Sequence, residues 1–239
     1  MTRRVLEAAY LLHSTPYRET SLIVDLFTRE HGRIAAVAKG AKRPHSSLRA
    51  ALMQFQPLRV SYAGRNELRT LTSAEWTGGS TTPRGDALLC AFYLNELLVR
   101  LLPREDAHPA LFDSYAQTLE ELAGGATLGE VLRRFEWTLL RETGYAPDLG
   151  HDAQDRPIVA GQRYRWQPAA GFVAAEPDAA ADSRSMLVDG STLSGLAEGR
   201  FESAGSRTQA KYLTRAILSY CLDGASLKTR QILIDLQKL

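Results

Sequence analysis

The chain has 239 residues, of which 44% are hydrophobic and 23% are charged, and its formal net charge at pH 7 is +2. This length suffices for one large or two small globular domains, each with its own core. No run of about 18 apolar residues occurs, so the sequence predicts no transmembrane helix. A signal peptide needs an uninterrupted apolar segment near the N-terminus, and here Glu7 and His13 interrupt it. We therefore expect a cytoplasmic protein with no membrane partner.

The charge is distributed unevenly along the chain. Residues 1–78 contain 12 lysines and arginines against 6 aspartates and glutamates, a net charge of +6, whereas residues 79–239 contain 17 against 21, a net charge of −4. Positive charge concentrated in one part of a chain is typical of proteins that bind a polyanion such as nucleic acid. Charge alone leaves the alternative open that this is a chance excess on an ordinary soluble surface.

The first third of the chain has the pattern of short strands. Branched and aromatic residues recur in five segments separated by turn-forming residues: 5–12, 21–28, 33–39, 52–62 and 67–76. His31-Gly32 predicts a tight turn, so residues 21–39 are expected to form a β-hairpin. Five such strands favour a small closed barrel of the OB type, although an SH3-like barrel or a plain meander would give much the same pattern.

A change of period marks a domain boundary after the strands. Residues 77–85 consist of turn formers and small polar residues, and leucines then recur at helical spacing up to Pro103. Further helices are predicted at 109–123, 127–144, 206–222 and 227–236, and Thr127 with Glu130 fits a capping box at the start of one of them. Residues 145–205 are less regular, with short strands near 163–166 and 171–173.

These patterns predict an α+β protein of two domains. Residues 1–78 are expected to form an OB-fold, and residues 79–239 a mainly α-helical domain with a small irregular, β-containing region at 145–205.

Motifs that carry catalytic chemistry are missing from the sequence. It has no phosphate-binding loop, no dinucleotide-binding glycine motif and no nucleophile elbow, and none of its five histidines stand at i, i+4. The two cysteines, Cys90 and Cys221, lie in separate helical apolar patterns, which argues against a disulfide framework or a metal site. We expect no enzyme and no cofactor. The rival reading, a nuclease or ligase fragment, would need clustered carboxylates or a nucleotide-accepting lysine.

Cations that could neutralise DNA phosphates fall into two groups. The first, in the predicted barrel, comprises Arg18, Arg33, Lys39, Lys42, Arg43 and Arg65. The second lies near the C-terminus and comprises Lys211, Arg215, Lys228 and Arg230, the first two on one helix face with Arg207. Aromatic side chains that could stack on bases are Tyr10, Tyr17, Phe27, Phe55 and Tyr62, of which Tyr17 is expected to be exposed.

Longer stretches of the chain resemble a known family. Residues 17–28, followed by His31-Gly32-Arg33 and 37–41, are similar to the start of RecO, a family of bacterial recombination mediators. Similar segments continue in the same order through 48–58, 64–75, 93–98, 132–136 and 144–145 to Leu227-Lys228-Thr229-Arg230, so that the matches run from residue 6 to 234.

The RecO resemblance implies an N-terminal OB-fold and a helical domain. It implies a DNA repair protein associated with the nucleoid that binds single- and double-stranded DNA, anneals complementary strands and works with RecR. It also implies help in loading RecA on strands covered by single-stranded DNA-binding protein (SSB), with RecF as a further partner. An adaptor that binds proteins and only weakly binds DNA is the alternative.

Two expectations concern the helical domain. The SSB tail is acidic and ends in phenylalanine, so we expect an apolar pocket rimmed by arginine, formed by Leu98, Arg133, Arg134 and Phe135. Many RecO proteins carry a four-cysteine zinc site after a Gly-Tyr-x-Pro segment, but residues 145–172 contain no cysteine. We therefore predict that no zinc is bound and that this region holds its shape by packing, with Trp166 and Phe172.

Overall fold

The structure is a computed structural model that describes residues 6–79, 81–176 and 187–236, with side chains described as far as Ile232. The chain forms two compact units. The first contains residues up to Ala126 together with the segment from Leu227 onward, and the second contains Thr127–Ser226. The predicted boundary between residues 78 and 79 stays a prediction.

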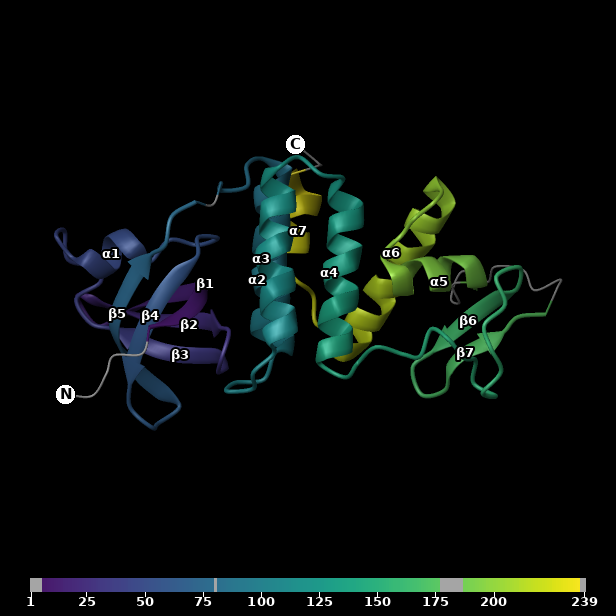
Figure 1. The fold of residues 1–239 in the computed structure, drawn as a ribbon, viewed down its shortest axis with the longest axis horizontal. Helices are drawn as coiled ribbons and strands as arrows, with labels where there is room; N and C mark the ends of the chain where they lie inside the picture. The colour runs from purple at the N-terminus through teal and green to yellow at the C-terminus, as the bar shows by residue number, and fades with distance from the viewer. Residues whose placement is uncertain (1–5, 80, 177–186, 237–239) are drawn as a thin grey trace. The chain divides into compact units, whose positions relative to one another are not determined.

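Five strands of the first unit close into a barrel (Figure 1). They are β1 (Glu7–Tyr17), β2 (Ser21–Thr28), β3 (Gly32–Ala38), β4 (Leu58–Ala63) and β5 (Leu68–Trp76), and they follow the order β1-β2-β3-β5-β4. Only β3 and β5 pair in parallel, and a short helix, α1 (Ser47–Ala51), connects β3 to β4. This arrangement confirms the predicted OB-type barrel, and the predicted hairpin at His31-Gly32 joins β2 and β3.

The ends of two strands follow from local pairing and backbone conformation. β1 extends beyond the apolar run of residues 5–12 as far as Tyr17, and its later part pairs only with β2, which leaves one edge on which Pro16 costs no ladder hydrogen bond. The strand predicted from residue 52 begins only at Leu58. Phe55 before it has φ of 63°, which is incompatible with an extended strand.

Two helices pack on the barrel within the first unit, α2 (Asp86–Leu101) and α3 (Pro109–Ala123). Tyr10 and Phe27 of the barrel meet Phe112 and Tyr115 of α3, with ring centroids 5.1 to 6.1 Å apart. The last helix, α7 (Lys228–Leu236), packs on α2. The Glu96 carboxylate accepts hydrogen bonds from the first backbone N–H groups of α7, so a side chain of α2 caps the C-terminal helix.

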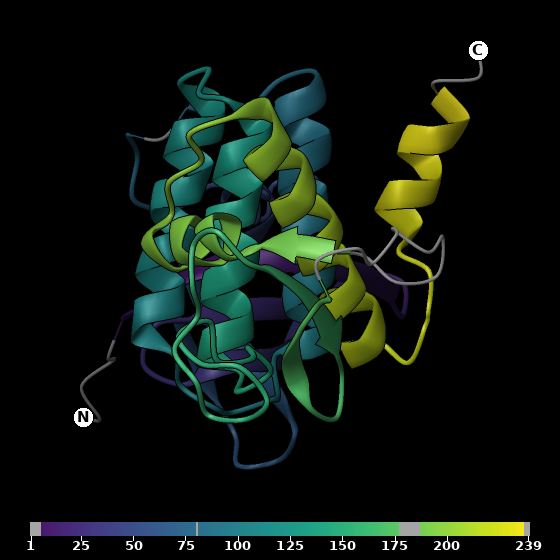
Figure 2. The same cartoon turned by 90° about the vertical axis from the view of Figure 1, so that its right-hand side faces the viewer.

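The second unit combines three helices with a small sheet (Figure 2). The helices are α4 (Leu128–Glu142), α5 (Gly190–Glu198) and α6 (Ala204–Cys221). The sheet has the order β7 (Gly171–Ala174), β6 (Arg163–Gln167), β8 (Leu187–Asp189). Figure 2 shows the β6–β7 hairpin beside the C-terminal half of α6.

The capping box predicted at the start of α4 is wrong. The Thr127 side chain makes no cap hydrogen bond, and Glu130 forms an ion pair with Arg207 of α6 at 3.5 Å instead. A capping box does occur at the start of α6, where Ser203 and Ser206 satisfy each other's backbone N–H groups. The Glu130 side chain therefore follows a long-range partner rather than the local motif.

Packing and local hydrogen bonds hold the cysteine-free region before and around the small sheet. Phe172 and Tyr164 are fully buried, and Trp166 meets Tyr220 of α6 edge to face at 6.0 Å. The Asp152 carboxylate accepts hydrogen bonds from two backbone N–H groups and from the guanidinium of Arg156.

No helix in the described ranges is long and apolar enough to cross a membrane. The same part of the chain contains no group of three or more histidine, cysteine or carboxylate side chains that could hold a metal ion. Cys90 is buried in α2 and Cys221 ends α6, and neither forms a disulfide.

Candidate functional site

A rigid basic loop follows β3. Lys39, Lys42 and Arg43 are exposed there, and Gly40, with φ of +72°, allows the sharp turn between them. The backbone N–H of Arg43 donates to the Gly40 carbonyl at 3.0 Å, and that of Lys42 donates to the Thr20 carbonyl at 2.9 Å. Because the backbone is satisfied internally, the three cationic side chains are left to face solvent on a fixed frame. We call Lys39, Lys42 and Arg43 the basic loop.

The basic loop borders an open surface groove of about 860 Å³. Lys39 and Arg43 line one side of the groove, and residues 72–75 of β5 line the other. Glu75 is the one carboxylate among the described residues that line it, and Arg59 lies opposite Glu75 in the β4–β5 register. The groove is therefore open and positively charged on balance, which suits an extended polyanion.

The β1–β2 turn brings Arg18 to the same end of the barrel. The hydrogen bond from Lys42 to Thr20 joins this turn to the basic loop. Arg18 is exposed with φ of 52°, and its guanidinium lies over the ring of Tyr17 at 5.1 Å from the centroid. The turn thus adds a cation and an aromatic face to the basic loop.

Arg65 lies at the other end of the barrel. It is exposed in the β4–β5 turn, and β5 runs parallel to β3 with Leu68 opposite Ala35. Arg65 precedes Leu68 by three residues and so lies level with the start of β3, whereas Lys39 directly follows the end of β3. At about 3.3 Å per residue this separates Arg65 from Lys39 by roughly 20 Å. The structure does not bring these two predicted cations together.

Arg33, predicted as a DNA contact, lies against α2. Its guanidinium donates to the backbone carbonyl of Val99 in α2 at 2.7 Å, and the side chain is only 14% exposed. Burial lowers the pKa of Arg33, and the nearby Asp25 partly opposes this shift. The Arg33 side chain therefore ties α2 to the barrel, and little of its surface is left for a phosphate.

Most aromatic residues proposed for base stacking are unavailable. Tyr10, Phe27 and Phe55 are buried, and the Tyr62 hydroxyl donates to Glu7. Only Tyr17, half-buried under Arg18, keeps a place beside the basic loop.

Trp76 is an exposed aromatic residue that the sequence analysis missed. It ends β5 next to Glu75 of the groove, and its side chain is 52% exposed. Its indole N–H donates to Gln56 Oε1 at 3.0 Å, and Gln56 is itself buried and bonded to Thr82. The ring is therefore held in place with its polar atom satisfied. Its position at the end of a strand, just before the glycine-rich boundary, was the available signal.

The predicted C-terminal cations divide between the two units. Lys228 and Arg230 are exposed on α7 in the first unit. Lys211 is exposed and Arg215 half-buried on α6 in the second unit. The buried face of α6 comprises Ala210, Leu213, Thr214, Ile217 and Leu218, so Arg207, Lys211 and Arg215 lie outside the buried face, as the helical spacing predicts.

The residues proposed for the SSB tail need correction. Leu98 and Phe135 have no exposed surface, because both occupy the core-facing positions of their helices. Arg134 is half-buried, and its aliphatic part lies beside Gly199. Arg133, the remaining one of the four predicted residues, lines a pocket in the described part of the chain.

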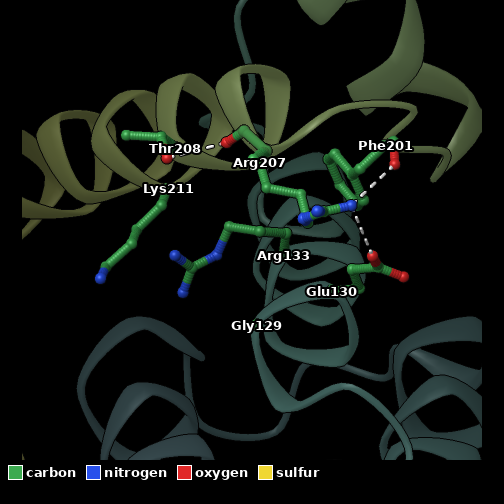
Figure 3. A pocket seen from close by; sticks show the side chains of 8 residues that line it. Gly129, Glu130, Arg133, Phe201, Arg207, Thr208 and Lys211 are labelled. Atoms are coloured by element: carbon green, nitrogen blue, oxygen red, sulfur yellow. Dashed lines mark hydrogen bonds and ion pairs between the residues drawn. The ribbon is translucent and has the colours of Figure 1, made fainter.

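This pocket, of about 260 Å³, lies between α4 and α6 within the second unit (Figure 3). Arg133 comes from α4 and Lys211 from α6, and Figure 3 shows both side chains extending into the same space. Arg207 completes the cationic lining while it pairs with Glu130 and donates to the Phe201 carbonyl. We call Arg133, Arg207, Lys211 and Phe201 the α4–α6 pocket.

Arg133 is the most constrained member of the α4–α6 pocket. It is 5% exposed and pairs with Glu136, which is fully buried one helical turn further along α4. Its Nε–H has no hydrogen-bond partner among the described residues. Arg133 lines the pocket, and a guanidinium pairs well with carboxylates.

Comparisons with known proteins agree with this architecture. The family model described as recombination protein O, N terminal, matches residues 1–79, and the model described as recombination protein O, C terminal, matches residues 83–231. A relative from Burkholderia pseudomallei is 52% identical over 233 residues, which cover 98% of this chain and 84% of the relative. A relative from Ralstonia nicotianae is 50% identical over 234 residues, 98% of this chain and 85% of its own length.

A third relative, from Polynucleobacter asymbioticus, is 47% identical over 239 residues, 98% of this chain and 97% of its own length. All three relatives are named DNA repair protein RecO. Family matches over nearly the whole chain, together with this identity, show that the chain belongs to the recombination protein O (RecO) family.

Proposed function

We propose that this protein is a DNA repair and recombination mediator without a catalytic centre. It binds single- and double-stranded DNA and anneals complementary strands in the cytoplasm, at the nucleoid. The observation that carries the proposal is the basic loop, whose three exposed cations stand on a fixed backbone beside an open groove of an OB-type barrel. OB-folds bind single strands with such loops.

Annealing requires charge neutralisation and no bond chemistry. Two complementary strands repel each other through their phosphates, so a protein that pairs cations with phosphates on each strand raises their local concentration and lowers the repulsion. The basic loop with Arg18 supplies four cations at one end of the barrel for this purpose. Arg65, Lys228 and Arg230 are exposed elsewhere on the first unit, and on the second unit Lys211 is exposed and Arg215 half-buried; these are the further phosphate contacts of the proposal.

Base stacking adds sequence-independent affinity for single strands. Trp76 presents an exposed aromatic face at the end of β5, one residue after Glu75 of the groove, and Tyr17 presents one beside the basic loop. Stacking of one base on an aromatic side chain contributes about 1–3 kcal/mol. We therefore expect Trp76→Ala to weaken binding of oligo-dT about fivefold or more, while Trp76→Phe retains most of the affinity. Equal affinity of the Ala variant and the wild type would remove Trp76 from the binding surface.

The α4–α6 pocket is the site we propose for the acidic tail of SSB. The carboxylates of the tail would pair with Arg207, Lys211 and the guanidinium of Arg133, and the terminal phenylalanine would lie against Phe201. The lining therefore combines cations with one aromatic ring, as the tail requires. Docking of this tail, together with RecR and RecF, would bring the protein to SSB-coated strands and help RecA to load there.

The proposal is tested by annealing of complementary oligonucleotides coated with cognate SSB. In the basic-loop variant Lys39, Lys42 and Arg43 are replaced by Ala. The matched control replaces three exposed arginines outside the barrel (Arg84, Arg141 and Arg163) by Ala and loses the same net charge. We expect the basic-loop variant to lose most of the annealing rate and single-strand affinity, and the control to keep both.

Other results would count against the proposal. Equal loss in the two variants would mean that only total charge matters. A wild-type protein that binds SSB and RecR but shifts no single-stranded DNA in a gel would favour the adaptor alternative. Strand cleavage or nucleotide hydrolysis by the pure protein with DNA, magnesium and ATP would favour an enzyme.

A further inference from the structure

A second pocket of the Thr127–Ser226 unit has the opposite character to the basic groove. It is a hollow of about 470 Å³ between the loop that precedes β6, the β6–β7 hairpin and the C-terminal end of α6. We call it the aromatic–acidic pocket, and its aromatic and acidic lining residues include Tyr145, Asp148, Asp152, Asp155, Trp166 and Tyr220. Its volume falls within the usual range of ligand sites.

Aromatic side chains form the walls of this pocket. Trp166 and Tyr220 stand edge to face, with ring centroids 6.0 Å apart and an interplanar angle of 81°. Tyr220 is 58% exposed and Tyr145 is 50% exposed, so large apolar surfaces remain open to solvent around the hollow. Exposed apolar surface of this kind, gathered round a concavity, is typical of a docking site rather than of an ordinary surface.

The charges at the pocket are almost all negative. Three aspartates line it, and the described lining residues include neither lysine nor arginine. Asp148 accepts from the Gly150 N–H and pairs with His151, which also lines the pocket. The hydrogen bond with Asp148 raises the pKa of His151, and the negative charges of Asp155 and Asp152 raise it further. This is the expected effect of a negative potential, which favours the protonated imidazole.

Asp155 is the carboxylate left for a ligand. Asp152 is fully engaged with backbone N–H groups and Arg156, whereas the Asp155 side chain is exposed and has no hydrogen-bond partner among the described residues. Its backbone is fixed, since its N–H donates to the Asp152 carbonyl at 2.9 Å. The pocket is therefore preformed, with a free carboxylate beside aromatic faces.

We propose that the aromatic–acidic pocket binds the guanidinium of an arginine on a protein partner. A guanidinium pairs with a carboxylate and stacks on aromatic rings, and Asp155 with Trp166 and Tyr220 offers both interactions in one place. The aspartates repel nucleic-acid phosphates, so this face is not used for DNA. The half-exposed tyrosines around the hollow are what a polypeptide would cover beyond the arginine itself.

The test titrates the ¹⁵N-labelled full-length protein with the peptide acetyl-Gly-Arg-Gly-amide. The control peptide carries citrulline, which has nearly the same shape as arginine but no charge. The readout is the indole N–H signal of Trp166, assigned with Trp166→Phe. We expect the arginine peptide to shift this signal and the citrulline peptide to bind about fivefold more weakly or not at all.

A matched pair of variants tests the carboxylate. Asp155 and Asp223 are both exposed and both have positive φ, 58° and 50°, a conformation that asparagine tolerates. Asp155→Asn should weaken the arginine peptide about fivefold, whereas Asp223→Asn, which loses the same charge outside the pocket, should not. Amide dispersion in the same spectra verifies that each variant is folded.

Three outcomes would overturn the proposal. These are equal binding of the arginine and citrulline peptides, unchanged affinity in Asp155→Asn, and a Trp166 signal that responds to spermidine but not to the peptide. The last result would assign the pocket to a small organic cation instead of a protein.

Discussion

A buried polar side chain connects α2 and α3 to the barrel, and its removal has a calculable cost. Asn95 of α2 is 3% exposed. Its Oδ1 accepts the hydroxyl of Tyr115, and its Nδ2 donates to the carbonyl of Leu12 at 2.9 Å. Leu12 lies at the register shift of β1, where the carbonyl is left out of the ladder with β2, and the Gln54 side chain supplies it with a second donor.

Asn95→Leu should destabilise the protein by about 2–4 kcal/mol. The substitution conserves volume approximately, so the cost is polar rather than a cavity. The hydroxyl of Tyr115, which has no exposed surface, loses its acceptor at about 1–3 kcal/mol, and the Leu12 carbonyl keeps Gln54 and loses about 1 kcal/mol. The measurement is urea unfolding followed by circular dichroism.

The double variant Asn95→Leu/Tyr115→Phe separates this cause from a packing defect. It also removes the hydroxyl whose hydrogen bond to Asn95 is lost, so it should be more stable than Asn95→Leu alone by about 1 kcal/mol or more. Gln117→Leu on the exposed face of α3 is the control and should change stability by less than about 0.5 kcal/mol. Two results would refute a polar origin of the loss. One is an Asn95→Leu protein as stable as the wild type; the other is a double variant whose loss of stability equals the sum of the two single losses.

Three further predictions concern the barrel. For single-stranded DNA, the plot of log affinity against log salt concentration should be shallower by about 2 in the basic-loop variant, because each of the three phosphate contacts contributes about 0.7 to the slope. An unchanged slope in a filter-binding titration would exclude these cations from the interface. Burial alone would raise the pKa of Glu7, but hydrogen bonds from Tyr62 and from the 30–31 backbone outweigh it and the pKa is lowered. The ionised Glu7 therefore stabilises the folded state above about pH 4.3, and this stability is lost as the pH falls through its lowered pKa. When the urea midpoint is measured between about pH 3 and 7, it should fall less steeply toward acid pH in Glu7→Gln than in the wild type. An equally steep fall in the variant would contradict this. Gly32→Ala should lower the free energy of unfolding by more than about 2 kcal/mol, because φ is +66° and the new Cβ would stand 1.8 Å from the Asp106 carbonyl oxygen. The control Gly78→Ala, where φ is +79° but the Cβ meets nothing within 4 Å, should lower it by about 1 kcal/mol. Equal losses in thermal unfolding would show that the overlap at Gly32 is relieved at no cost.

Local pattern determined which segments become strands and helices. The alternation of residues 21–39 around His31-Gly32 predicts the β2–β3 hairpin, and the leucine spacing after residue 85 predicts α2, because both depend on interactions between residues close in the chain. The basic loop was predictable for the same reason, since its three cations are neighbours in sequence and the turn formers around them keep the segment at the surface.

The tertiary structure decided which of the predicted site residues are available. Arg33 and Lys39 look alike in the sequence, but the Val99 carbonyl of α2, 66 residues away, takes the guanidinium of Arg33 out of solvent. Arg133 gains a pocket only because α6 places Lys211 across from it, and Arg65 is far from Lys39 because β5 runs parallel to β3. A local pattern indicates which face of an element is apolar; long-range contacts decide what covers it.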